Sequence, residues 1–299
     1  MNSEGPAFPT CSPRCVGAPP LSGLLAALGA LVFSGCVAPP EESPVRLSEW
    51  VKGIAVTSPA QEDMTLYIWF YEWNLFDAMR PGENTRGTWK NEVKISQDQK
   101  TGTMVSDSPG LSLKVSAGVE SADLTLSMNN QSDHNWPPLA AIIPCYSPGP
   151  KAVRNPQFTN QKTFFLGAEG LEPLVARELH YNHELRPAVD HVAHQWEESL
   201  DPNSRPSDRF PWSFRWPDSA VDARGGLIVR ESTDGKWVTG IAWERFLSAQ
   251  AHNPWDCMHL SIHLGPLEKG ESREVRGKIY LFQGTKEELL ERYLSDFQE

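Results

Sequence analysis

Apolar and polar residues alternate along much of this 299-residue chain, which is the pattern of half-buried β-strands. Segments 111–115 and 124–128 alternate strictly, and segment 65–71 is dense in aromatic and β-branched residues. The pair Asp234-Gly235 lies between two further segments of this kind and predicts a tight hairpin turn. The remaining predicted strands are 226–231, 237–243, 258–264 and 275–282.

Helical patterns are confined to two places. Thr285 and Glu288 have the spacing of a capping box at the start of a C-terminal helix. Its apolar stripe consists of Leu289, Leu290, Tyr293, Leu294 and Phe297. A second helix is predicted over 190–200. Many strands, few short helices and no regular alternation of strands with helices predict an all-β fold, a sandwich or barrel of antiparallel sheets.

The N-terminal region carries an apolar run, 21–33, that ends in Ser34, Gly35 and Cys36. The run is too short to span a membrane as a helix, and small residues follow it, so a cleaved signal is the better interpretation. It resembles a bacterial lipoprotein signal, in which the cysteine becomes the lipidated first residue of the mature protein. An ordinary secretory signal with a cysteine there by chance is the alternative. Either interpretation places the protein outside the cytoplasm.

This interpretation divides the chain into a signal peptide over 1–35, a lipid anchor and Pro-rich tether over 36–50, and a single β-sandwich domain over 51–299. The net charge of −11, without a basic run, argues against nucleic acid as a partner. Attachment to a membrane of the cell envelope, on its periplasmic side or at the cell surface, would rest on the lipid of Cys36 alone. Cys145 and Cys257 could pair in that oxidising compartment or remain free.

Two further stretches carry a family resemblance. Segment 124–132 resembles the strand and Asn-x-Ser step of galactose-mutarotase-like supersandwich proteins, and segment 264–272 resembles their Pro-Leu-x-x-Gly-Glu turn. The mature chain is also similar to a set of uncharacterised planctomycete-type lipoproteins and secreted proteins, most distinctively over 71–78 and 252–259. The supersandwich resemblance implies a large antiparallel β-sandwich and a carbohydrate setting, since sugar epimerases, lyases and sugar-recognition domains share that architecture.

The sharpest candidate chemistry lies around strand 258–264. His259 and His263 share one face of that strand, which places two imidazoles over a groove or over solvent, while its apolar residues face the core. Asn253 and Trp255 lie in the turn just upstream. An aromatic face beside amide and imidazole donors suits a pyranose ring, so we expect substrate contacts here. The alternative is that the histidines line the outer face of a sheet and pair with neighbours.

A second candidate cluster lies in segment 177–184. If that segment is a strand, His180 and Asn182 share a face with two carboxylates and could bind a sugar or perform acid–base chemistry. Arg177 could hold a substrate carboxylate with two hydrogen bonds, as a uronic acid would offer. A solvated polar strand is the alternative interpretation.

Two carboxylates at predicted strand ends are candidates for a general acid or base. Glu72 precedes Trp73, and Glu244 follows Trp243, so each joins an aromatic ring to a carboxylate where sites commonly assemble. We expect His259 and His180 to act with one of these carboxylates, while Trp73 stacks on the ring. As isolated residues, the two glutamates could equally be structural hydrogen-bond acceptors.

Three functions therefore remain open. The first is an envelope lipoprotein that binds a carbohydrate and could process it by epimerase-, lyase- or hydrolase-like chemistry. The second is a non-catalytic assembly lipoprotein that holds a protein partner through the aromatic loop 209–216. The third is a metal-dependent hydrolase, which needs His191 and His194 to meet a third ligand, although their spacing matches no zincin motif. No phosphate loop, Gly-x-Ser-x-Gly or Cys-x-x-Cys motif is present, so we assign no cofactor and no metal ligand.

Overall fold

The computed structural model describes residues 44–70, 91–106, 110–136, 140–174, 191–194, 223–252 and 255–297. All of them belong to one compact unit, Glu42–Glu299. The predicted site residues outside this part of the chain are Cys36, Glu72, Trp73, Arg177, His180, Asn182 and Asn253.

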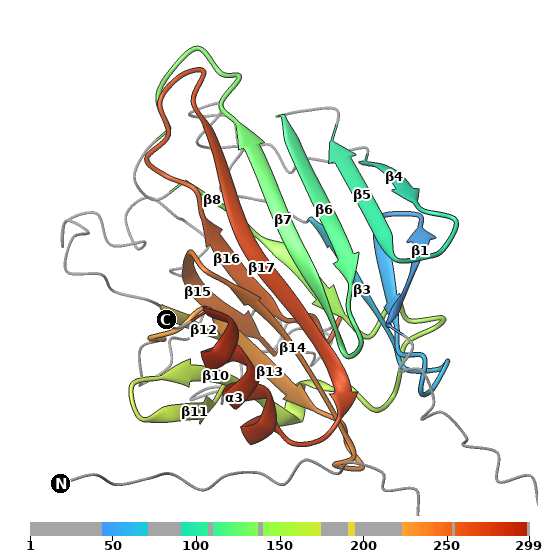
Figure 1. Cartoon of the computed structure of the whole chain (residues 1–299). Coiled ribbons are helices and arrows are strands. Elements are labelled where there is room, and N and C mark those ends of the chain that lie inside the picture. Colours follow the sequence, from blue (N-terminus) through green and yellow to red (C-terminus); the bar gives the residue numbers. More distant parts are fainter. Residues whose placement is uncertain are drawn as a thin grey trace, which may run out of the picture. The chain divides into compact units, whose positions relative to one another are not determined.

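The described strands pair antiparallel in three sheets (Figure 1). The nine-stranded sheet has the order β11-β10-β13-β14-β17-β7-β6-β5-β4, and the four-stranded sheets have the orders β1-β2-β3-β9 and β12-β15-β16-β8. The strands are β1 Arg46–Trp50, β2 Gly53–Thr57, β3 Thr65–Phe70, β4 Asn91–Ile95, β5 Thr101–Ser106, β6 Leu111–Ala117, β7 Ser121–Asn129, β8 Ala141–Ile142, β9 Pro144–Ser147, β10 Thr163–Gly167, β11 Gly170–Pro173, β12 His191–His194, β13 Leu227–Glu231, β14 Trp237–Trp243, β15 Phe246–Ala251, β16 His259–His263 and β17 Ser272–Gln283.

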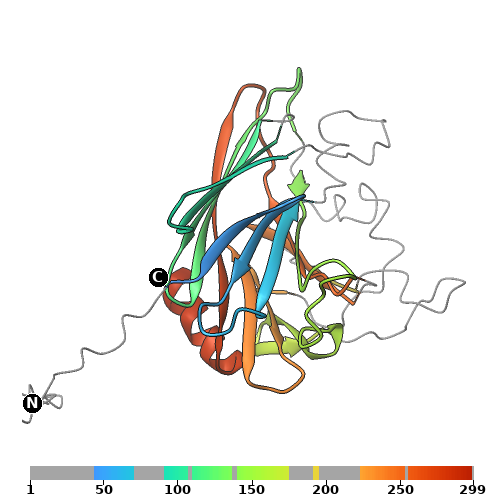
Figure 2. The ribbon, with the colours of Figure 1, turned by 90° about the vertical axis from the view of Figure 1, so that its right-hand side faces the viewer.

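One hydrophobic core joins the three sheets. Leu126 of the nine-stranded sheet, Ile68 of the first small sheet and Leu260 of the second all belong to it and are fully buried. Figure 2 shows the blue strands β1–β3 facing the long strands of the nine-stranded sheet. The predicted all-β fold of large antiparallel sheets is therefore confirmed, and the core lies between the large sheet and the two smaller ones.

Helix α3, Lys286–Phe297, covers the other face of the nine-stranded sheet. The predicted capping box is present, because the Glu288 N–H donates to Thr285 Oγ1 at 3.2 Å and the Thr285 N–H donates to Glu288 Oε2 at 2.8 Å. Leu289 and Tyr293 pack with apolar residues of β13, β14 and β17. Strand β14 is consequently buried on both faces. Within the described part of the chain, no helix combines the length and the apolar character needed to cross a bilayer.

The structure departs from the sequence-based expectations at two places. Residues 191–194 form strand β12, which pairs with β15, so the predicted helix over 190–200 is wrong there; pairing with a sheet edge overrides the local pattern. Strand β1 lies inside the 36–50 range expected to be tether, because Leu47 enters the core and β1 pairs with β2 along its whole length. The predicted β13–β14 hairpin is confirmed, with Gly235 at φ 72°.

The two motifs that carry the supersandwich resemblance meet at Asn130. This side chain is fully buried, and its Nδ2 donates to the carbonyl oxygens of His134 at 2.9 Å and Leu267 at 3.0 Å. Its Oδ1 accepts from the Ser132 N–H at 3.0 Å and from the Ser132 hydroxyl at 2.5 Å. The Asn130 backbone also bonds the turn before β17, by donating to the Glu271 carbonyl. Asn130 thus fastens the end of β7 to the β16–β17 connection.

We expect Asn130→Ala to lower the free energy of unfolding by about 3 kcal/mol, because it leaves several buried polar groups without partners. Asn129→Ala is the matched control. Asn129 makes one side-chain hydrogen bond near the surface, from Nδ2 to Ser272 Oγ at 2.7 Å, so its loss should cost about 1 kcal/mol. Urea unfolding of both variants measures the difference, and equal losses would show that Asn130 has no special structural role.

Candidate functional site

Strand β16 presents two histidines on one face, as the sequence predicts. Leu260 and Ile262 enter the core, while His259 pairs in register with Gln250 of β15 on the opposite face. The expectation of exposed imidazoles is not met, because His259 and His263 are only 7% and 6% exposed. Whether either histidine is catalytic or binds substrate remains a prediction.

The residues between and beside these histidines form a buried polar layer. Gln250 Nε2 donates to Ser248 Oγ and to Ser261 Oγ, both at 2.9 Å, and the Ser248 hydroxyl donates to Ser261 Oγ at 3.0 Å. All three side chains are almost completely buried. These hydrogen bonds offset part of the cost of removing the three side chains from water, whereas the buried Gln250 Oε1 has no hydrogen-bond partner among the described residues.

Two cysteines lie close to the N-terminal end of β16, one in β9 and one just before β16. Cys145 of β9, Cys257 and His259 are buried, and their ligand-type atoms all lie within 4.8 Å of one another. Cys145 Sγ lies 3.2 Å from His259 Nε2. Neither thiol forms a disulfide in the structure, so of the two alternatives for these cysteines the structure has the reduced one. Hydrogen bonds from Cys145, and then from His259 and Ser147, hold the pKa of Cys257 below its usual range, although burial acts in the opposite direction.

The turn that carries Cys257 is fixed by Asp256, which has φ 54°. Its Oδ2 lies 3.0 Å from Arg154 Nη1, and its Oδ1 accepts the Asn160 N–H at 3.1 Å. The Asp256 carbonyl accepts from Arg230, which is 1% exposed. Burial lowers the pKa of Arg230 to about 10, which leaves it charged at neutral pH.

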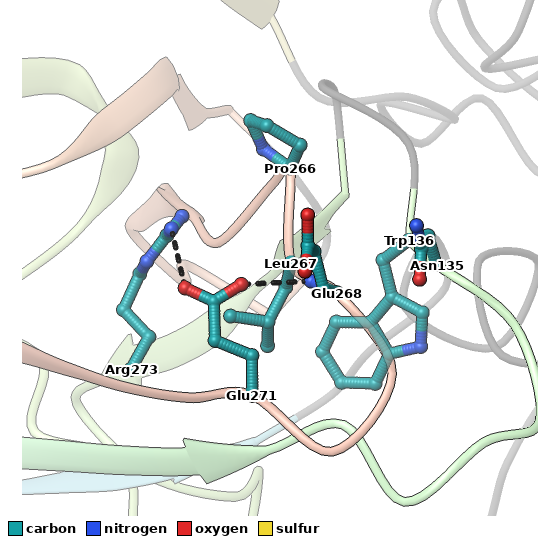
Figure 3. Close-up of a pocket in the computed structure, with 7 residues that line it drawn as sticks. All are labelled: Asn135, Trp136, Pro266, Leu267, Glu268, Glu271 and Arg273. Carbon is teal, nitrogen blue, oxygen red and sulfur yellow. Dashed lines mark hydrogen bonds and ion pairs between the residues drawn. The ribbon is translucent and has the colours of Figure 1, made fainter.

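An open pocket of about 450 Å³ lies at the turn between β16 and β17 (Figure 3). Its lining residues are Asn135, Trp136, Pro266, Leu267, Glu268, Glu271 and Arg273. The isolated bridge between Trp136 and Leu267 joins residues 135–136 to the turn at 266–273. Asn130 holds the same turn through its hydrogen bond to the Leu267 carbonyl. The pocket therefore rests on the buried asparagine that joins the two resemblance motifs.

Polar groups in this pocket are held in place by one another. Glu271 Oε2 accepts the backbone N–H of Glu268 at 2.8 Å, and Glu271 Oε1 lies 3.6 Å from Arg273 Nη2. Asn135 Oδ1 accepts the Lys269 N–H at 2.9 Å, which orients the amide. Burial, followed by the charge of Arg245, lowers the pKa of Arg273. Of this lining, only segment 264–272 was recognised from the sequence, and only as a turn, because nothing in a single sequence shows that residues 135–136 and 266–273 meet.

The other predicted site residues that the structure describes lie elsewhere. The Glu244 carboxylate accepts the Arg276 backbone N–H at 2.7 Å and Arg276 Nε at 2.8 Å, an arrangement typical of a structural acceptor. Trp255 is 64% exposed on the turn before Asp256. Acid–base chemistry by Glu244 and stacking by Trp255 remain predictions, as do the roles of the predicted residues outside the described part of the chain.

Comparison with known proteins gives only distant likenesses. No family model matches the chain, and no curated protein matches it. Among solved structures it is similar to a galactose mutarotase related enzyme from Lactobacillus acidophilus, with 11% identity, a TM-score of 0.39 and coverage of 81% of this chain and 98% of the other. It is also similar to a putative aldose 1-epimerase from Escherichia coli K12, with 13% identity, a TM-score of 0.35 and coverage of 68% and 71%. At these values no argument about the activity of this chain rests on either likeness.

We expect the turn that presents Cys257 to depend on Asp256. Asp256→Ala removes the ion pair with Arg154 and the hydrogen bond from Asn160, and it places alanine at a positive φ, so the free energy of unfolding should fall by about 3 kcal/mol. Asp256→Asn is the matched control, because asparagine tolerates that φ and retains an acceptor, and it should cost about half as much. Urea unfolding measures both, and equal costs for the two variants would contradict this role.

Proposed function

We propose that this protein binds a neutral carbohydrate in the pocket at the β16–β17 turn. The observation that carries the proposal is the lining: an indole and a leucine form an apolar wall beside two carboxylates, an amide and a guanidinium. The cavity of about 450 Å³ lies within the range of about 300–1,000 Å³ that is usual for small-molecule sites.

The chemistry of the lining favours a polyol. Sugar hydroxyls both donate and accept hydrogen bonds, so Glu268 and Glu271 can accept from them while Arg273 and the Asn135 amide donate. The apolar wall of Trp136 and Leu267 suits the C–H face of a ring. Trp136 is only 1% exposed and Leu267 is fully buried, so each contributes an edge of the wall rather than an open stacking platform.

The charge of the pocket favours a neutral sugar over a uronic acid. Glu268 and Glu271 supply two negative charges and Arg273 one positive charge, and Glu271 already pairs with Arg273. A ligand carboxylate would therefore be repelled by Glu268, because the only cation of the lining, Arg273, already pairs with Glu271. This proposal differs from a uronate site built on Arg177, which the sequence also allows.

We expect Glu268→Gln to weaken binding of a neutral sugar at least tenfold, because a charge-assisted hydrogen bond to a hydroxyl is replaced by a neutral one. The test is calorimetry and thermal shift of the chain against neutral sugars, uronic acids and their oligomers. Glu274→Gln is the matched control, since Glu274 is an exposed glutamate on β17 outside the lining, and it should leave binding unchanged. A panel without any binding sugar, or an equal effect of both substitutions, would contradict the proposal.

We propose in addition that the mature protein is an envelope lipoprotein anchored through Cys36. The support is the sequence alone: a short apolar run that ends in small residues and a cysteine. An acidic chain without a basic run would gain little from electrostatic attraction to anionic lipids, so the acyl chains would supply the attachment.

Expression in a bacterial host with a labelled fatty acid tests this anchor. The wild-type chain should incorporate the label and fractionate with membranes, whereas Cys36→Ser should do neither. Cys15→Ser is the matched control, because it lies before the apolar run and should leave labelling intact. Labelling that survives Cys36→Ser would contradict the anchor, and so would a wild-type chain without label.

A further inference from the structure

The strand register around Tyr146 and Met258 brings two thiols and an imidazole to one point. The two residues exchange both backbone hydrogen bonds, from the Tyr146 N–H at 3.0 Å and from the Met258 N–H at 2.7 Å. In an antiparallel pair of this kind, the next residues along each strand are directly opposite one another. Cys145 therefore lies opposite His259, and Cys257 lies opposite Ser147, on the face away from the core.

This register places Cys145 and Cys257 on a diagonal. Diagonal neighbours across antiparallel strands are typically about 7–8 Å apart at Cα, and a disulfide needs a Cα separation of about 4.4–6.8 Å. Bridging the two cysteines would therefore require the backbone to move. Their sulfur atoms nevertheless lie within 4.8 Å of each other, because both side chains point to the same spot.

The separations suit two ligands of one metal ion. With Zn–S near 2.3 Å and Zn–N near 2.0–2.1 Å in a tetrahedral site, a sulfur and a nitrogen ligand are about 3.5 Å apart and two sulfurs about 3.8 Å apart. Cys145 Sγ and His259 Nε2 lie 3.2 Å apart, and the remaining separations are within 4.8 Å. An ion could therefore enter with small side-chain adjustments and no change of register.

A hydroxyl and a guanidinium surround the Cys257 sulfur. Ser147 is 1% exposed, and its Oγ accepts the Gly149 N–H at 3.1 Å, so its hydroxyl proton can point at the Cys257 sulfur. The guanidinium of Arg230, held at the Asp256 carbonyl, adds a fixed positive charge beside Cys257. Both groups lie around the Cys257 sulfur, where they could hold a metal-bound sulfur in place from outside the ligand set.

We propose that Cys145, Cys257 and His259 form a buried binding site for a thiophilic metal ion, with Zn²⁺ as the first choice. Two thiolates and an imidazole are a zinc-type ligand set, and three protein ligands leave a fourth position for water or another group. The site is independent of the sugar pocket, since it shares no residue with the pocket lining.

The test measures metal content and spectrum of the full chain, purified with reductant and loaded with Zn²⁺ or Co²⁺. We expect one equivalent of tightly bound metal and, with Co²⁺, thiolate-to-metal charge-transfer absorption. Cys145→Ser and Cys257→Ser should each abolish that absorption, and His259→Gln should weaken Co²⁺ binding at least tenfold. Two matched controls should keep the metal: His263→Gln, the other buried histidine of β16, and the triple variant C11S/C15S/C36S, which removes every other cysteine.

A second measurement on the wild-type chain covers the case in which the cysteine variants fail to fold. Zn²⁺ should raise the melting temperature and protect Cys145 and Cys257 from alkylation during partial unfolding, and a chelator should reverse both effects. The proposal is overturned if the reduced wild-type chain takes up no metal, if the bound metal survives loss of Cys145 and Cys257, or if the triple variant loses it.

Discussion

The exchange of two hydrogen bonds between Tyr146 and Met258 is the interaction on which the arrangement of the three sheets depends. Tyr146 belongs to β9, where it pairs with Ile68 of the first small sheet, and Met258 leads directly into β16 of the second. The Tyr146 hydroxyl reaches Thr239 Oγ1 of the nine-stranded sheet at 2.7 Å. Since the Thr239 hydroxyl donates to the Tyr280 carbonyl, Tyr146 is the donor in that bond. One fully buried tyrosine therefore contacts all three sheets.

The pairing of Tyr146 with Met258 also determines which side chains lie together on the face of these strands that points away from the core. With Tyr146 and Met258 in the core, their chain neighbours must point to the other face, because side chains alternate along strands. Burying the polar side chains next to Tyr146 and Met258 costs free energy, and hydrogen bonds offset that cost. Arg230 donates to the Asp256 carbonyl, and Ser147 forms a hydrogen bond with Cys257. A shift of one residue in this register would exchange the polar and apolar faces, so the register is strongly specified.

Much of the fold could be predicted from local patterns. The alternation in β6 and β7, the Asp234-Gly235 turn and the capping box of α3 all form as expected, because each is decided by residues close together in the sequence. Strand β9 escaped prediction because it is four residues long, begins with proline and shows neither alternation nor an apolar run. The helix expected near His191 failed because pairing with β15 decides the structure there.

The candidate sites were harder to predict because they depend on contacts between residues that are far apart in the sequence. His259 was selected from its own strand, but its neighbour Cys145 is 114 positions away in the sequence. The two meet because β8 and β9 pair with β16 and the residues just before it. The pocket likewise joins residues 135–136 to the turn before β17 through Asn130. Local patterns in one sequence indicate which face of a strand is polar. Which two polar faces lie side by side depends on how strands that are far apart in the sequence pair.

Amide hydrogen exchange at Tyr146 and Met258 is the most direct test of this account. If their mutual hydrogen bonds hold the three sheets together, both amides should exchange only through global unfolding, with the same opening free energy as amides of the central strand β14. Exchange of Tyr146 and Met258 by local opening, while β14 stays protected, would contradict it. The two small sheets would then be joined by the core and by the pairing of β8 with β16.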